Sequence, residues 1–213
     1  MSFFNRIINS LDTTQFELYS LFLLSDGEWS PEKKKRLDDI RKNMQISYDS
    51  VRDCYTRCKN SKLGDGNHSE WVINEMKQAM RRSLSYQDYD KDYINRYVKI
   101  VWNMINLSFA DGEYSEAERE VVQYLAKRWR IKSLIMMELI DTAETIVMLN
   151  KLKMWKQTTA QPGENTDERI KDIEKQIQCM YKNVQATIEE ADAVPKTRKP
   201  TKKKLESGED VQS

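Results

Sequence analysis

The sequence has few of the residues that interrupt helices or form covalent cross-links. Its 213 residues include only 6 glycines and 4 prolines. A chain poor in turn-forming residues and rich in Glu, Lys, Arg, Leu and Met favours helices throughout. The 3 cysteines, of which Cys54 and Cys58 are four positions apart, do not form a disulfide framework. With a single histidine, His68, the chain lacks the residues for a zinc site or a thiol–imidazole pair.

The chain also lacks an excess of charge of one sign. With a net charge of +1, the protein as a whole has no strong electrostatic attraction to nucleic acid or anionic lipid, so no specific nucleic-acid partner is expected. The most apolar stretch, residues 131–149, contains four charged residues, which predicts that no segment crosses a membrane. The first residues lack the apolar core and cleavage site of a signal peptide. Together with the unpaired thiols, these features predict a cytoplasmic protein.

Motifs that carry catalysis are missing as well. The sequence contains no nucleophile elbow, no phosphate-binding glycine loop, no paired histidine ligands and no Ser/His/Asp ordering. Glu113 and Glu118 are acids, but no substrate-orienting group accompanies them. We therefore expect a protein that is not an enzyme.

One motif occurs twice in the sequence. Residues 25–30 read Ser-Asp-Gly-Glu-Trp-Ser, and residues 110–115 read Ala-Asp-Gly-Glu-Tyr-Ser. Each copy follows an apolar run and precedes a helix that begins at its serine. Two copies of one helix–turn–helix unit predict a pseudo-symmetric helical bundle.

The apolar spacing predicts where the helices lie. A short amphipathic helix near residues 3–8 and a central apolar helix over 16–24 are followed by a long element that Ser30 and Pro31 open and that reaches Cys58. Further helices are expected over 69–80, 94–109, 115–129 and 134–155. The tryptophans other than Trp29 fall on apolar stripes and are expected in the core. Lys33, Lys34, Lys35 and Arg36 are expected to form a solvated face.

A change of composition divides the chain after about residue 156. Residues 1–156 form the predicted helical domain, 157–166 a polar linker, 167–191 an amphipathic helix with coiled-coil-like spacing, and 192–213 a disordered, charged tail. The apolar stripe of the 167–191 helix, which includes Ile170, Ile173 and Ile177, either folds back onto the bundle or pairs with a copy of itself or a partner. Basic residues from Lys196 to Lys204 leave open a weak contact of the tail with anionic surfaces.

The two acidic turns have a structural explanation and a functional one. Glycine suits a positive φ, the preceding Asp bonds to the turn, and Ser115 with Glu118 matches a capping box. On the other hand, carboxylates brought together from two turns would repel unless a cation neutralised them. Calcium takes six to eight oxygen ligands of this kind. The spacing is not that of an EF-hand.

Residues 110–122, Ala-Asp-Gly-Glu-Tyr-Ser-Glu-Ala-Glu-Arg-Glu-Val-Val, together with 125–131, Leu-Ala-Lys-Arg-Trp-Arg-Ile, carry a resemblance to a known family. They resemble the second half of TerB-like (tellurite-resistance B) domains, which are similar to the N-terminal region of DjlA-type co-chaperones. The resemblance covers about residues 1–155, and Asp26-Gly27 matches the first turn of that family. It implies an all-helical bundle that binds Ca²⁺ or another divalent cation. It also implies a non-catalytic role in stress response or membrane-associated complexes.

The predicted metal ligands are Asp26, Glu32, Asp111 and Glu118. In the family pattern an acid follows the Asp of each turn by seven positions, as Glu118 follows Asp111. Lys33 occupies that position after Asp26, with Glu32 one place earlier. A lysine there repels a cation unless Glu32 turns in and Lys33 turns out. The alternative is a metal-free adaptor that self-associates or binds a protein partner through residues 167–191.

Overall fold

The structure is a computed structural model. It describes residues 3–27, 30–49, 51–53, 56, 68–83, 93–159 and 166–191, with side chains described from residue 13 onward. Trp29, Cys54 and Cys58, most of the loop that follows them, part of the predicted linker and the predicted tail 192–213 lie outside the described residues.

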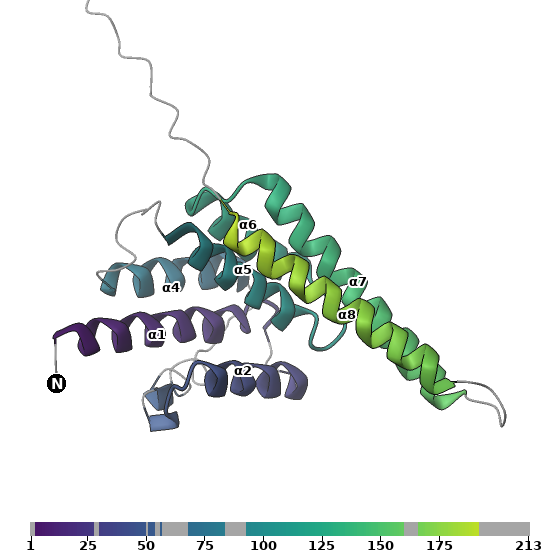
Figure 1. Ribbon diagram of the computed structural model, residues 1–213. Helices are drawn as coiled ribbons and strands as arrows, with labels where there is room; N and C mark the ends of the chain where they lie inside the picture. Colours follow the sequence, from purple (N-terminus) through teal and green to yellow (C-terminus); the bar gives the residue numbers. More distant parts are fainter. Residues whose placement is uncertain are drawn as a thin grey trace, which may run out of the picture.

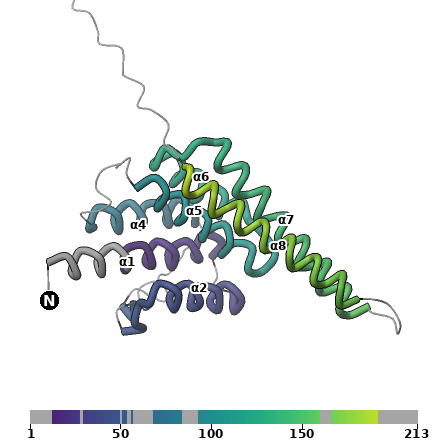
Figure 2. The backbone as a smooth tube through the Cα atoms, viewed as in Figure 1, coloured from purple at the N-terminus to yellow at the C-terminus, as the bar shows by residue number. Residues whose placement is uncertain are grey.

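The predicted all-helical fold is confirmed, because the described residues form helices and no strand (Figures 1 and 2). Their bounds are α1 Phe3–Phe22, α2 Pro31–Asn43, α4 His68–Arg82, α5 Ile94–Ser108, α6 Glu116–Arg128, α7 Ser133–Thr158 and α8 Thr166–Glu189. Among the helices in these ranges, none has both the length and the apolar content that a membrane span requires.

Two predicted boundaries at the start of the chain are wrong. The short amphipathic helix and the apolar run are one helix, α1, of 20 residues. The long element expected to reach Cys58 instead ends at Asn43. Gln45 has a left-handed φ of 56°, and the amides of Gln45 and Ile46 bond back to the carbonyls of Lys42 and Arg41. These two bonds form a Schellman motif, which ends α2 although the apolar spacing of the sequence continues beyond it.

The internal repeat extends further than the acidic turn. Helices α2 and α6 each have 13 residues, and both end in the same cap. Arg130 has the same left-handed φ of 56° as Gln45. The Arg130 amide donates to the Lys127 carbonyl, and the Ile131 amide donates to the Ala126 carbonyl. Lys33 and Glu118 are 85 positions apart, and the same offset relates these two caps. The repeat therefore includes a turn, a helix and its cap.

Helix α5 lies at the centre of the bundle. Ten of its 15 residues are buried, and it contacts α1, α2, α6, α7 and α8. Helix α4 packs against α1 on one side and α6 on the other. Because α5 leads into the second acidic turn and also contacts α2, the packing of α5 brings the two turns to the same end of the bundle.

Helices α7 and α8 form a hairpin that lies across α5 and extends beyond the rest of the bundle (Figure 1). Val184 and Ile188 of α8 are buried in the main hydrophobic core, and Ile173, nearer the tip of the hairpin, is also buried. Of the two arrangements left open by the sequence, the structure shows the one in which α8 folds back. Most of the apolar stripe of α8 is thus covered by the chain's own helices.

Candidate functional site

The first acidic turn follows directly from α1. The Gly27 amide donates to the Leu24 carbonyl at 3.1 Å, and Gly27 has a φ of +92°. Only glycine adopts this φ without strain. Ser30 then caps α2, where its hydroxyl oxygen accepts from the Lys33 amide at 3.2 Å. This geometry fixes Asp26 before the glycine and Lys33 on the first turn of α2.

The second turn repeats that backbone. The Gly112 amide donates to the Phe109 carbonyl at 3.1 Å, and Gly112 has a φ of +93°. The predicted capping box is confirmed: Ser115 accepts from the Glu118 amide, and Glu118 Oε2 accepts from the Ser115 amide at 3.0 Å. Unlike its counterpart Lys33, Glu118 thereby closes the cap from both sides.

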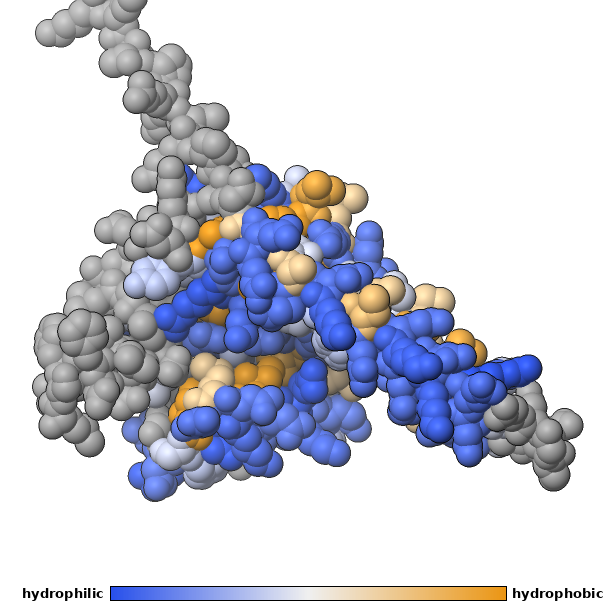
Figure 3. Space-filling view, viewed as in Figure 1, coloured by the Kyte–Doolittle hydropathy of each residue, from blue (hydrophilic) through white to orange (hydrophobic). Residues whose placement is uncertain are grey.

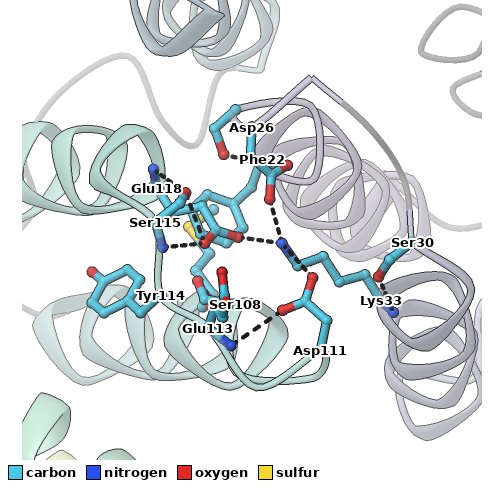
Figure 4. Close-up of polar contacts among 12 residues, drawn as sticks. Phe22, Asp26, Ser30, Lys33, Ser108, Asp111, Glu113, Tyr114, Ser115 and Glu118 are labelled. Atoms are coloured by element: carbon cyan, nitrogen blue, oxygen red, sulfur yellow. Dashed lines mark hydrogen bonds and ion pairs between the residues drawn. The ribbon is translucent and has the colours of Figure 1, made fainter.

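The two turns meet at the Lys33 ammonium group (Figure 4). Lys33 Nζ lies 2.5 Å from Asp26 Oδ2, 3.0 Å from Asp111 Oδ2 and 3.0 Å from Glu118 Oε1. Only 2% of the Lys33 side chain and none of the Glu118 side chain is exposed to solvent, whereas Asp26 and Asp111 are 27% and 28% exposed. We call these four residues the Lys33 junction.

Burial and charge have opposite effects on the lysine. Desolvation favours the neutral amine, but hydrogen bonds from Lys33 to Asp26, Glu118 and Asp111 outweigh it and raise the pKa of Lys33 above its usual value. For Glu118, burial raises the pKa, and the hydrogen bond from Lys33 opposes that effect. Lys33 therefore stays charged at neutral pH and provides the countercharge for a carboxylate that has no access to water.

The structure reverses the expected orientation of Glu32 and Lys33. Glu32 is exposed and lines a separate hollow of about 360 Å³ beside Lys35 and Arg36. It is not a member of the junction, because Pro31-Glu32-Lys33 begin a helix and adjacent helical positions point in different directions. The expectation that residues 33–36 form one solvated face is wrong at Lys33 and fits the exposed Lys34, Lys35 and Arg36.

The junction as built does not fit the divalent cation that the resemblance implies. Lys33 donates to one oxygen of each of the three carboxylates, so a divalent cation would have to displace a buried ammonium group that is also positively charged. The second oxygen of Glu118 is held by Ser115, through its amide and its hydroxyl. In the described part of the chain, no three His, Cys, Asp or Glu residues are grouped as a metal site requires.

Sequence reasoning identified Asp26, Asp111 and Glu118 but did not identify Lys33 as the residue that joins them. The signal was in the repeat itself, since Lys33 occupies the position of Glu118 in the other copy. A base and an acid at equivalent positions of two facing copies can pair across a pseudo-twofold arrangement. Their pairing required the packing of α2 against α5, which the linear pattern does not give.

Comparison of the chain with family models, with curated proteins and with solved structures finds no match. The resemblance to TerB-like domains therefore stays a prediction that rests on residues 110–131 and on the first turn.

Proposed function

We propose that this protein is a non-catalytic, TerB-like helical module for the assembly of protein complexes, in which Lys33 takes the place of a divalent cation. The module is then held in its folded form whether or not calcium is present. The observation that carries this proposal is the buried Lys33 ammonium at 2.5–3.0 Å from three carboxylates, those of Asp26 and Asp111 in the two turns and that of Glu118 in α6.

The chemistry of the junction supports a structural role. Glu118 uses one oxygen for Lys33 and the other for Ser115, so it is already satisfied by hydrogen bonds. A general acid or base needs access to a substrate, and the side chain of Glu118 is completely buried. The exposed thiol of Cys179 favours a reducing compartment, so we place the module in the cytoplasm.

Thermal unfolding of the full chain in EDTA and in about 5 mM Ca²⁺ tests the proposal. We expect the two midpoints to coincide, because the lysine already neutralises the carboxylates. A midpoint that rises with Ca²⁺ would mean that the ion displaces Lys33, and it would overturn the proposal in favour of a calcium-binding module.

The substitution Lys33→Glu sharpens the test. It gives both copies of the repeat an acid at the same position and leaves four carboxylates without a base. We expect this variant to be destabilised in EDTA and stabilised by Ca²⁺, by about 2.7 kcal/mol at a concentration one hundred times its Kd. Lys34→Glu is the matched control, because it makes the same charge change on the exposed side of α2. If both variants respond equally to Ca²⁺, the junction is not the origin of the effect.

A further inference from the structure

The outer face of α7 carries large apolar side chains that the chain itself does not cover. Met136, Leu139, Ala143 and Ile146 form the buried face of this 26-residue helix. Leu134 and Met148 nevertheless expose 72% and 71% of their surface, and Met137, Leu152 and Trp155 are also exposed. The expectation that Trp155 belongs to the core is therefore wrong.

These exposed residues lie along one line of the helix. Leu134, Met137, Met148, Leu152 and Trp155 are separated by steps that keep them on one face at 3.6 residues per turn. Figure 3 shows apolar surface recurring along the edge of the molecule formed by α7, from the body toward the tip of the hairpin. We call this line of five residues the α7 stripe. Asp141 lies on the same face between Met137 and Met148, so the stripe consists of two apolar groups, one in each half of the helix. Exposed apolar groups on one helix face are typical of an interface.

The charged residues of α7 are unevenly distributed along the helix. The first half of the helix, residues 133–145, contains Glu138, Asp141 and Glu144 and no base. The second half, residues 146–158, contains Lys151, Lys153 and Lys156 and no acid. Asp141 is exposed on the face of the stripe itself, and Glu144 and Lys151 are exposed at its flank. Within the chain, Glu144 lies 3.9 Å from Arg119, and Lys153 pairs with Glu174 of α8 at 2.5 Å.

A second copy of α7 in antiparallel orientation complements this pattern. It places the acidic half of one helix opposite the basic half of the other, and it brings Leu134 and Met137 toward Met148, Leu152 and Trp155 of the second copy. A parallel arrangement would place acids against acids and lysines against lysines. An antiparallel pair of identical faces also has twofold symmetry, which closes the assembly at two chains.

We propose that the α7 stripe is a dimer interface, through which two α7–α8 hairpins pack in antiparallel orientation. The proposal rests on the assembly role proposed above and names a second copy of the chain as the partner. It moves the predicted self-association from residues 167–191 to α7, because the apolar face of α8 is largely covered within the chain. The dimer interface does not involve Lys33. A mass measurement that contradicts the dimer would therefore leave the proposal for the Lys33 junction intact, and melts with Ca²⁺ that contradict the junction would leave the dimer intact.

Sedimentation equilibrium of the full chain tests the interface. We expect a dimer whose dissociation becomes measurable on dilution. Leu134→Glu and Met148→Glu are each expected to weaken self-association by roughly 10-fold or more, since each places a charge within one of the two apolar groups of the contact. Tyr48→Glu is the control, because Tyr48 is also exposed, at 56%, but follows α2 in the chain and is not part of α7, so its variant should stay dimeric. A monomer at every concentration, or a dimer that both stripe variants preserve, would overturn the proposal.

A charge exchange tests the antiparallel orientation independently of folding defects in the stripe variants. Asp141→Lys and Lys151→Asp should each weaken the dimer, and the double variant should recover it, because the exchanged charges face each other again. Failure of the double variant to recover would exclude this orientation. Flotation with anionic and zwitterionic vesicles completes the test: binding of a monomer that Met148→Glu abolishes would assign the stripe to a membrane surface and overturn the dimer.

Discussion

The two acidic turns have nearly the same backbone but opposite charge at one position. Gly27 and Gly112 have φ values of +92° and +93°, and each turn leads into a 13-residue helix capped by a serine. Lys33 follows the first turn where Glu118 follows the second. Two identical copies would bring carboxylates together without a base, whereas this pair of copies supplies its own cation. A lysine in one copy and a glutamate at the equivalent position of the other thus form an ion pair that joins the two copies.

The largest expected effect comes from removing the positive charge of Lys33. Lys33→Met keeps the apolar stem but leaves the buried Glu118 without its countercharge. We expect a loss of about 3–5 kcal/mol of unfolding free energy, as is found when one partner of a buried ion pair is removed. Urea unfolding at pH 7 measures it. Lys34→Met, on the exposed side of the same helix, should change stability by no more than about 0.5 kcal/mol. Equal losses in both variants would contradict the role of the junction.

The loss in Lys33→Met should depend on pH. Burial raises the pKa of Glu118, and Lys33 opposes that shift, so the variant should raise this pKa further. An acid whose pKa is higher in the folded state favours folding at low pH and loses that contribution as the pH rises from its unfolded pKa, about 4.3, through its folded pKa. The stability gap between wild type and variant should therefore narrow as the pH falls from 7 toward 4. A gap that stays constant over this range would show that Glu118 is not the group left unpaired.

The two turn glycines should differ in their tolerance of alanine. Both have a positive φ that costs about 1–3 kcal/mol for other residues. A Cβ at Gly27 would also lie 2.9 Å from two ring atoms of His68, whereas a Cβ at Gly112 meets nothing within 4 Å. We expect Gly27→Ala to be the more destabilising, by roughly 1 kcal/mol. In the background of His68→Ala this excess should disappear, and its persistence would contradict the contact with His68.

The smallest difference concerns the two serine caps. Ser115 takes part in a complete capping box with Glu118, whereas Ser30 accepts from the Lys33 amide without a returning carboxylate. Ser115→Ala should therefore cost more than Ser30→Ala, with both losses within about 0.5–2 kcal/mol. Thermal unfolding of the two variants under the same conditions compares them. The reverse order would mean that the reciprocal bond contributes little.

Much of the fold could be read from the sequence, because helices depend on local spacing. The second turn and its capping box were predicted in detail, since Ser115 and Glu118 are only three positions apart. The end of α2 was missed because its cap depends on a left-handed Gln45, and glutamine is not a residue that marks such a position. Trp155 was misplaced because an apolar residue on a periodic stripe has the same pattern whether its own chain or a partner covers it.

The sequence by itself determined that two acidic turns exist, that each is shaped by a glycine and that each begins a helix at a serine. These properties depend on residues within a few positions of one another. Only the tertiary structure decided that Lys33 points inward between Asp26, Asp111 and Glu118. It also decided that the apolar face of α8 is covered by other helices of the chain, whereas α7 leaves large apolar side chains exposed. The physical reason is that the direction of a charge or an apolar stripe is set by how helices distant in sequence pack, and helical spacing alone does not contain that information.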